Sequence, residues 1–169
     1  MRKVEVVPHD RHWQSMFEAE SQQLAIAFGD NAIAIYHIGS TSIDTIYAKP
    51  IIDILIAVKD IGKVDNRNTQ IESLGYIAMG EFGIAGRRFF RKDNELGIRT
   101  HHIHTFEEGS AQIDRHLAFR DYLKSHPEAA QAYSTLKQQL AHQFPADMEK
   151  YMDGKADFIQ QIDIKAGEW

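Results

Sequence analysis

A single carboxylate, Asp53, interrupts the apolar run from Ile51 to Val58. The run is long and aliphatic enough to be a central strand that is buried on both faces. An ionised group in such a strand is costly unless a cation or several hydrogen-bond donors pair with it. The preceding apolar run, Ile33 to Ile38, ends in a Gly39-Ser40 turn. We therefore expect Asp53 to lie beneath this turn and to have a specific partner there.

The Gly39-Ser40 turn is suited to a phosphate. The segment from Thr41 to Tyr47 is predicted to form a short helix, whose free N-terminal amides would lie beside the turn. A metal ion held by Asp53 and by the phosphates of a nucleotide would satisfy the carboxylate, since magnesium often binds through one or two carboxylates plus substrate oxygens. In the alternative interpretation the carboxylate is only structural and accepts hydrogen bonds from Ser40, Thr41 or Lys49.

Three histidines, His101, His102 and His104, fall within four consecutive positions. On a strand, His102 and His104 share one face and His101 lies on the other. Two imidazoles on one face can chelate a transition metal, transfer protons or donate hydrogen bonds to a phosphate. No His-Glu-x-x-His pattern supplies a third ligand for zinc. We expect at least one of these histidines to belong to the site.

Basic residues form a third group. A predicted hairpin carries Arg87, Arg88, Arg91, Lys92 and Arg99. Arg88 shares a strand face with Phe90, whereas Arg87 shares the other with Phe89. One face can line a phosphate or carboxylate pocket, because arginine offers bidentate donors, but strand parity alone does not decide which. Lys155 lies on an apolar helical stripe, so its ammonium either reaches solvent along its aliphatic stem or meets an anion.

The elements that must position these residues follow from hydrophobic periodicity. We predict helices over residues 10–28, 110–125, 127–143 and 147–165, a loop and helix over 60–74, and strands over 33–38, 51–58, 75–79, 87–92 and 98–106. Mixed strands followed by a helical tail predict an α/β (α+β) fold. No repeat or low-complexity linker divides the chain, so we expect one domain over residues 1–169.

Composition limits the classes of function. The 169 residues carry a formal net charge of −5 and no cysteine, which excludes disulfides, thiolate metal sites and cysteine nucleophiles. The balance of charge predicts no nucleic-acid binding. We find neither a signal-peptide core nor a window of about 18 apolar residues, so we expect a cytoplasmic protein without a membrane span.

Ordered motifs in the chain resemble the GrpB family. They are His37-Ile38-Gly39-Ser40-Thr41, Ala48 to Ile54, Gly86 to Lys92, Thr100 to His104 and Arg115 to Leu123. The similarity runs from the Val-Pro-His-Asp start to the Gly154-Lys155 helix and covers nearly the whole chain. It implies a nucleotidyltransferase-like mixed β-sheet core flanked by helices, with a C-terminal helical tail. Members fused to dephospho-CoA kinase imply nucleotide or coenzyme A chemistry.

The wider superfamily pattern is a Gly-Ser turn, then an acid, an apolar residue and a second acid on the next strand, and a third acid on a later strand. Gly39 and Ser40 match the turn, and Asp53 matches the first acid. Leu55 stands where the second acid is expected. Two-metal phosphoryl transfer needs ligands at both positions. Either one ion suffices with help from histidine, or the protein binds a nucleotide-like ligand without transferring it.

The resemblance implies nucleotidyl or phosphoryl transfer with one divalent ion, Mg²⁺, from a nucleotide or another phosphate-bearing small molecule. It implies catalytic roles for Asp53, His102 and His104, with Asp53 and His104 as metal ligands. The implied phosphate- or nucleotide-binding residues are His37, Gly39, Ser40, Thr41, Lys49, Arg88 and Lys155. The alternative is a catalytically inactive binding module that acts as a sensor or as the partner of another enzyme. A histidine-based metal site that performs hydrolysis is a third hypothesis.

Overall fold

A five-stranded mixed sheet forms the centre of the computed structural model, which describes residues 3–169. The strand order is β1-β2-β5-β4-β3, where β2 and β5 run parallel and all other neighbours are antiparallel. The strands are β1 (Ala32–Ile38), β2 (Ile52–Val58), β3 (Tyr76–Ala78), β4 (Arg88–Asp93) and β5 (Arg99–Glu107). This arrangement confirms the predicted α/β (α+β) class.

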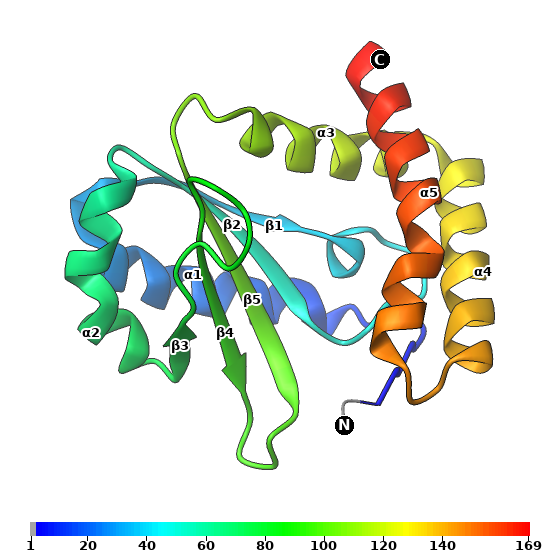
Figure 1. The fold of residues 1–169 in the computed structure, drawn as a ribbon, viewed down its shortest axis with the longest axis horizontal. Coiled ribbons are helices and arrows are strands. Elements are labelled where there is room, and N and C mark those ends of the chain that lie inside the picture. The colour runs from blue at the N-terminus through cyan, green and yellow to red at the C-terminus, as the bar shows by residue number, and fades with distance from the viewer. Residues whose placement is uncertain (1–2) are drawn as a thin grey trace.

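The helices cover both faces of the sheet and one of its ends (Figure 1). They are α1 (His12–Phe28), α2 (Asn68–Glu72), α3 (Ala111–Ser125), α4 (Pro127–Gln143) and α5 (Met148–Glu168), with 3₁₀ turns at Gly29–Asn31, Ser40–Ser42 and Ile61–Arg67. Helices α1 and α2 pack on one face, whereas α3 packs on the other. Helices α4 and α5 stand side by side and confirm the predicted helical tail.

Local signals explain where the last three helices begin. At the start of α3, the Ser110 hydroxyl accepts a hydrogen bond from the backbone amide of Gln112. At the start of α5, the Asp147 carboxylate accepts one from the backbone amide of Lys150. Pro127 occupies the first turn of α4, where its missing N–H has no intrahelical partner to lose. All three helices were predicted, and α4 and α5 also show the helical periodicity of buried positions.

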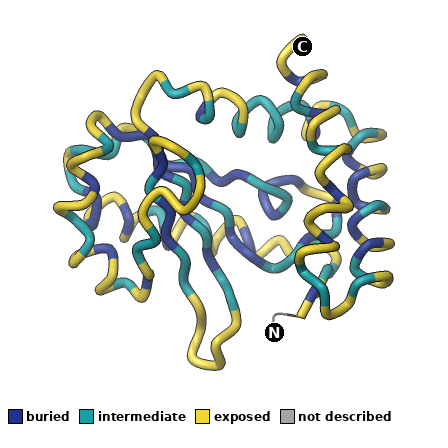
Figure 2. Tube along the Cα trace, viewed as in Figure 1, coloured by how far each residue is buried: buried dark blue, intermediate teal, exposed yellow. Residues whose placement is uncertain are grey.

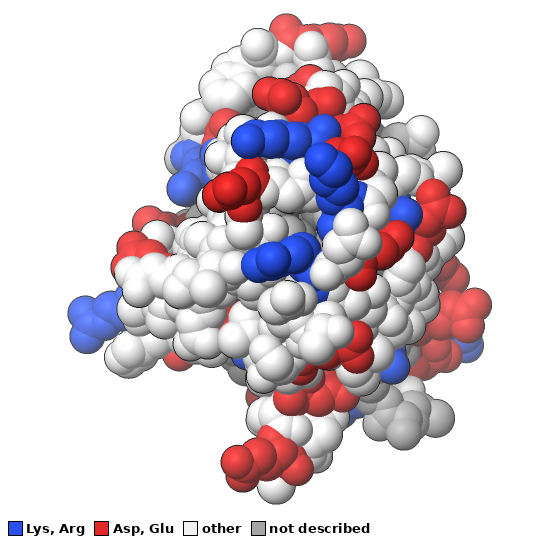
Figure 3. Space-filling model, turned by 90° about the vertical axis from the view of Figure 1, so that its left-hand side faces the viewer, with Lys and Arg blue, Asp and Glu red and all other residues white. Residues whose placement is uncertain are grey.

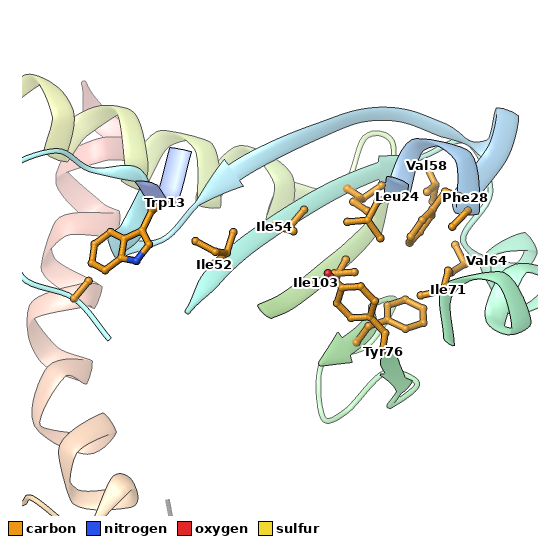
Figure 4. Close-up of a cluster of buried hydrophobic side chains, with 14 residues drawn as sticks. Trp13, Leu24, Phe28, Ile52, Ile54, Val58, Val64, Ile71, Tyr76 and Ile103 are labelled. Carbon is orange, nitrogen blue, oxygen red and sulfur yellow. The ribbon is translucent and has the colours of Figure 1, made fainter. Parts of the chain in front are cut away.

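Strand β2 is buried on both faces, as its aliphatic composition predicts (Figure 2). Ile52, Ile54 and Val58 pack with α1 and α2 in the core drawn in Figure 4, where Leu24 and Phe28 extend from α1. Leu55 and Ala57 alternate with them and pack under α3 on the opposite face. The alternation therefore places Asp53 on the α3 face.

The predicted helix from Thr41 to Tyr47 is wrong. Only one 3₁₀ turn, Ser40–Ser42, follows β1, and the chain beyond it is irregular. The Ser42 hydroxyl donates to the Gly39 carbonyl, and the Thr41 hydroxyl donates to the carbonyl of Ile51. Short polar side chains that bond locally to the backbone compete with helix formation. No helix N-terminus is therefore available here for a phosphate.

Surface charges are mixed. On the face shown in Figure 3, acidic and basic side chains are interspersed. None of the helices in the described part of the chain combines the length and the hydropathy that a membrane crossing requires.

Candidate functional site

Asp53 lies near the start of β2, between two neighbouring strands. The register places it opposite Ile38 on β1 and beside His102 on β5. Its side chain is 28% exposed and opens into a cavity of about 300 Å³. The walls of the cavity come from the Gly39 turn, β2, β5 and helices α3, α4 and α5. The buried acid thus faces a recess large enough for a small ligand.

Two imidazoles hold the Asp53 carboxylate. His102 Nδ1 and His104 Nε2 lie 3.5 and 3.3 Å from Asp53 Oδ1. On their other nitrogens, Arg99 donates to His102 over 3.1 Å and Arg87 donates to His104 over 3.3 Å. A guanidinium can only donate, so each histidine accepts from its arginine and carries its hydrogen on the nitrogen that faces Asp53. The site therefore contains two parallel relays from arginine through histidine to one carboxylate.

These contacts keep Asp53 ionised. Burial alone would raise the pKa of Asp53, but the hydrogen bonds and charges of His102 and His104 hold it well below its ordinary value of 3.8. Burial lowers the pKa of His102, although the charge of Asp53 opposes that effect. His116, which also lines the cavity, has its pKa lowered to about 3, chiefly by burial. Asp53 therefore stays ionised at neutral pH, with the ring nitrogens of His102 and His104 directed at its carboxylate.

The Gly39 turn lies directly against Asp53. Gly39 has a φ of 72°, and a Cβ added there would lie 2.7 Å from Asp53 Oδ2. Only glycine combines this backbone conformation with so close an approach. The turn therefore presents bare backbone beside the carboxylate, and Ser40 and Thr41 extend along the cavity wall.

His37 supports the turn from outside the cavity. Its buried ring stacks on Phe17 of α1 with centroids 4.9 Å apart, and its Nε2 lies 2.9 Å from the Thr41 hydroxyl. Burial lowers the pKa of His37 to about 4, so the ring is neutral and donates to Thr41. Because Thr41 in turn donates to Ile51, this chain of hydrogen bonds ties the turn to the residue that precedes β2. His37, predicted to bind phosphate, is instead placed behind the turn.

Three lysines line the same cavity. Lys155 was predicted from its apolar stripe, and its Nζ lies 4.7 Å from the centroid of the Tyr151 ring. Lys49 contacts Tyr151 and the sulfur atoms of two methionines of α5. Lys137 of α4, which sequence reasoning missed, is only 1% exposed and lies over Tyr133. The sequence does contain a signal for Lys137, because position 137 falls on the apolar stripe of α4, just as Lys155 falls on that of α5.

Burial and mutual repulsion act on two of these lysines. Burial, together with the charges of Lys155 and Lys49, lowers the pKa of Lys137 to about 6. Burial and the charge of Lys49 lower the pKa of Lys155 to about 7, although Asp53 raises it. At neutral pH both groups are close to the point at which they lose their charge, and a nearby anion would restore it.

The prediction that Arg88 binds phosphate disagrees with its position. Arg88 shares the far face of the sheet with Phe90 and forms an ion pair with Asp65 over 2.8 Å. Arg87 faces the site instead: its guanidinium packs 4.7 Å from the centroid of the Phe89 ring and reaches His104. Strand alternation correctly assigned these two arginines to opposite faces of the sheet. The packing of β4 decided which of the two faces approaches Asp53.

The donor set fits one metal ion only in part. Within residues 3–169, no group of three or more acidic or histidine side chains is arranged to hold a metal. Asp53 is the one carboxylate among the described residues that line the cavity, and Leu55 is fully buried at the second acid position. His104 carries a hydrogen on the nitrogen facing Asp53, so that nitrogen has no lone pair for a metal. A Mg²⁺ ion therefore fits at Asp53 only if a ligand supplies most of the remaining oxygens.

The mixed sheet and its flanking helices resemble the fold of a nucleotidyltransferase. A structure of the Cid1 poly(U) polymerase superposes with a TM-score of 0.53 over 83% of this chain and 44% of that chain, at 10% sequence identity. The likeness concerns the fold alone.

The chain belongs to the GrpB family: the family model described as GrpB protein matches residues 3–165. It is similar to the crystal structure of conserved protein GrpB from Enterococcus faecalis, with a TM-score of 0.91 and 43% identity over 96% of both chains. It is 46% identical to the UPF0157 protein YqkA of Bacillus subtilis over 99% of this chain. The alignment spans 48% of YqkA, so this chain covers about half the length of that relative. The family and fold predictions are confirmed.

Proposed function

We propose that this protein transfers a nucleotidyl or phosphoryl group from a phosphate-bearing ligand that binds in the cavity at Asp53. The observation that carries the proposal is the convergence of an ionised carboxylate, a bare glycine turn and buried lysines on one recess. The nucleotidyltransferase-like fold supports the same chemistry, since the Cid1 poly(U) polymerase structure that shares this fold has MgGTP bound.

The residues that line the cavity have roles that follow from their positions. Asp53 would hold one divalent ion together with phosphate oxygens, and the two imidazoles keep the carboxylate ionised and oriented. Mg²⁺, when bound, neutralises phosphate charge and polarises the reacting phosphoryl group. The Gly39-Ser40 turn lets a phosphate approach the backbone closely. Lys155 supplies positive charge from α5.

The reaction exchanges one phosphorus–oxygen bond for another. An acceptor oxygen forms the new bond to phosphorus, and the bond to the leaving phosphate or diphosphate breaks with its electron pair. The proton of the acceptor passes to solvent, because a carboxylate held so far below its ordinary pKa is too weak a base to retain it.

A second candidate is a binding module that holds the same ligand without transfer. Leu55 favours it, since this fully buried side chain occupies the second acid position and cannot ligate an ion. Both candidates require the ligand to bind at Asp53, and they differ only in turnover.

The test combines binding with turnover. Affinities for nucleoside triphosphates are measured with and without Mg²⁺, and diphosphate release is followed with water as the simplest acceptor. We expect Mg²⁺-dependent binding and slow release that falls about 100-fold or more in Asp53→Asn. Asp157→Asn, at an exposed position of α5, is the control and should behave as wild type. Binding without release in the wild type would favour the binding module, and equal release by Asp53→Asn would refute the proposal.

A further inference from the structure

Lys137 carries a buried amine whose Nζ has no hydrogen-bond partner among the described residues. Its side chain is 1% exposed, and its Nζ lies 4.5 Å from the centroid of the Tyr133 ring. A buried ammonium without an anionic partner is costly. A bound anion in the cavity that Lys137 lines would satisfy it.

A second unpartnered donor belongs to a residue that lines the same cavity. The Tyr151 hydroxyl is buried without a hydrogen-bond partner in the described chain, and Tyr151 lines the cavity from α5. Burial raises the pKa of Tyr151, so the hydroxyl keeps its proton. Lys155, 6% exposed, lies over the same ring. The region between α4 and α5 therefore presents two ammonium groups and a phenol, all of which can donate.

The donor cluster and Asp53 line one cavity, to which β2, α4 and α5 all contribute. The charge of Asp53 raises the pKa of Lys155, so the two groups act on each other across this cavity. One phosphate offers too few oxygens to satisfy Lys137, Lys155 and Tyr151 as well as a metal ion at Asp53. A chain of phosphates carries the oxygens and the charge for all of them.

We propose that Lys137, Lys155 and Tyr151 form a subsite for the terminal phosphates of a ligand that carries a diphosphate or triphosphate chain. The inference rests on the proposed function, which assigns the proximal phosphate to the Asp53 end of the cavity. It adds which part of the ligand the lysines recognise. A nucleoside monophosphate or orthophosphate has a single phosphate and cannot engage the Asp53 end and the subsite together. Two ammonium groups in contact with one recess match the several negative charges of a polyphosphate.

Proton uptake is an independent consequence. The charged groups that act on Lys137 are Lys155 on α5 and Lys49 before β2, and its Nζ lies over the ring of Tyr133 on α4. The other titratable groups that line the cavity are Asp53, His102, His104, Arg115, His116 and Tyr151. Because Lys137 and Lys155 have lowered pKa values near neutrality, a polyanion that binds them raises those values and draws protons from solution. Binding should therefore weaken as the pH rises above about 7.

Calorimetry with inorganic triphosphate, diphosphate and orthophosphate tests the subsite directly. We expect the wild type to bind triphosphate and diphosphate more tightly than orthophosphate, with proton uptake at pH 7.5. Lys137→Met should weaken binding of the two longer anions by about 30-fold or more. The same variant should change the affinity for a nucleoside monophosphate by less than about twofold and should reduce the proton uptake. Lys165→Met, at an exposed position of the same tail, is the matched control.

The outcomes separate this inference from the proposed function. Diphosphate affinity in Lys137→Met that equals the wild-type value overturns the subsite, even if Asp53-dependent transfer is observed. If polyphosphate binding depends on Lys137 but no nucleotidyl or phosphoryl transfer is observed, the subsite is supported and the proposed catalysis is not. Lys137→Arg, which keeps the positive charge, should retain polyphosphate binding better than Lys137→Met, and thermal unfolding of both variants shows whether they fold. Failure of the wild type to distinguish diphosphate from orthophosphate also overturns the subsite.

Discussion

Replacement of Lys137 by methionine is expected to stabilise the ligand-free protein while it weakens polyphosphate binding. Methionine keeps an unbranched apolar side chain, one atom shorter than that of lysine, and removes the ionisable group. The side chain is 1% exposed and its ammonium has no hydrogen-bond partner in the described residues, so no contact of the folded protein offsets its desolvation apart from the Tyr133 ring. Binding and stability should therefore change in opposite directions.

The size of the effect follows from the pKa of Lys137, which is lowered from 10.5 to about 6. At pH 7 the unfolded chain carries a protonated lysine, whereas the folded protein holds it mostly neutral. The ordinary pKa lies about 3.5 units above pH 7, and each unit is equivalent to about 1.4 kcal/mol. Full desolvation would therefore cost about 5 kcal/mol, and local relaxation around the charge reduces the expected gain in Lys137→Met to about 3–5 kcal/mol.

The dependence on pH has a definite sign. Between about pH 6 and pH 10.5 the unfolded state binds more protons at Lys137 than the folded state does, so wild-type stability rises with pH in this window. The contribution of one such group is about 1.4 kcal/mol per pH unit. Lys137→Met removes this contribution, while that of Lys155 remains between about pH 7 and pH 10.5.

Denaturant unfolding at pH 7, 8 and 9 measures both quantities, with Lys165→Met as the control. For a chain of this length, a gain of 3 kcal/mol corresponds to a rise in melting temperature of about 6–12 °C. A Lys137→Met protein that is no more stable than the wild type at pH 7, and that keeps the wild-type slope between pH 7 and 9, would refute the reasoning.

Three further predictions concern the Asp53 end of the site and the far face. Asp53→Asn should lower the free energy of unfolding by about 2–3 kcal/mol at pH 7, since it loses charge-assisted hydrogen bonds. Because the pKa of Asp53 is lowered, this difference should shrink as the pH falls below about 3.8, which denaturation at pH 3 checks. Gly39→Ala should cost about 1–3 kcal/mol from its φ of 72° and should weaken nucleotide binding, because the new Cβ displaces Asp53; unchanged affinity in a titration would contradict the close approach. Arg88→Gln should change stability by less than about 1 kcal/mol and leave nucleotide affinity unaltered, since Arg88 pairs with Asp65 on the other face; a tenfold loss of affinity would return Arg88 to the site.

Strand β2 shows why much of the fold could be predicted. Burial on both faces leaves a continuous aliphatic run, and the two-residue period of a strand then separates Asp53 and Leu55 from Ile52 and Ile54. The last two helices were equally predictable, because each combines a helical stripe with a local start signal, Pro127 for α4 and Asp147 for α5. In these elements, local sequence and tertiary burial favour the same structure.

The segment after Gly39 shows where the prediction failed. A short helix was predicted from Thr41 to Tyr47. Instead, the hydroxyls of Thr41 and Ser42 bond to backbone carbonyls, and Ile43 and Ile46 are buried against the helical tail. The packing of a short segment between two larger elements outweighs its weak intrinsic preference. The same limitation explains why Lys137 was missed, since its importance depends on the neighbouring helix.

The sequence by itself determined the family, the strand faces and the chemical identity of the groups at Asp53, because these depend on residue order and on local periodicity. Only the tertiary structure decided which groups meet. The parallel register of β2 and β5 places His102 beside Asp53, the packing of β4 directs Arg87 to His104, and the pairing of α4 with α5 brings Lys137 to the same cavity as Lys155. These contacts join residues distant in the chain, and their formation depends on the packing of the whole fold.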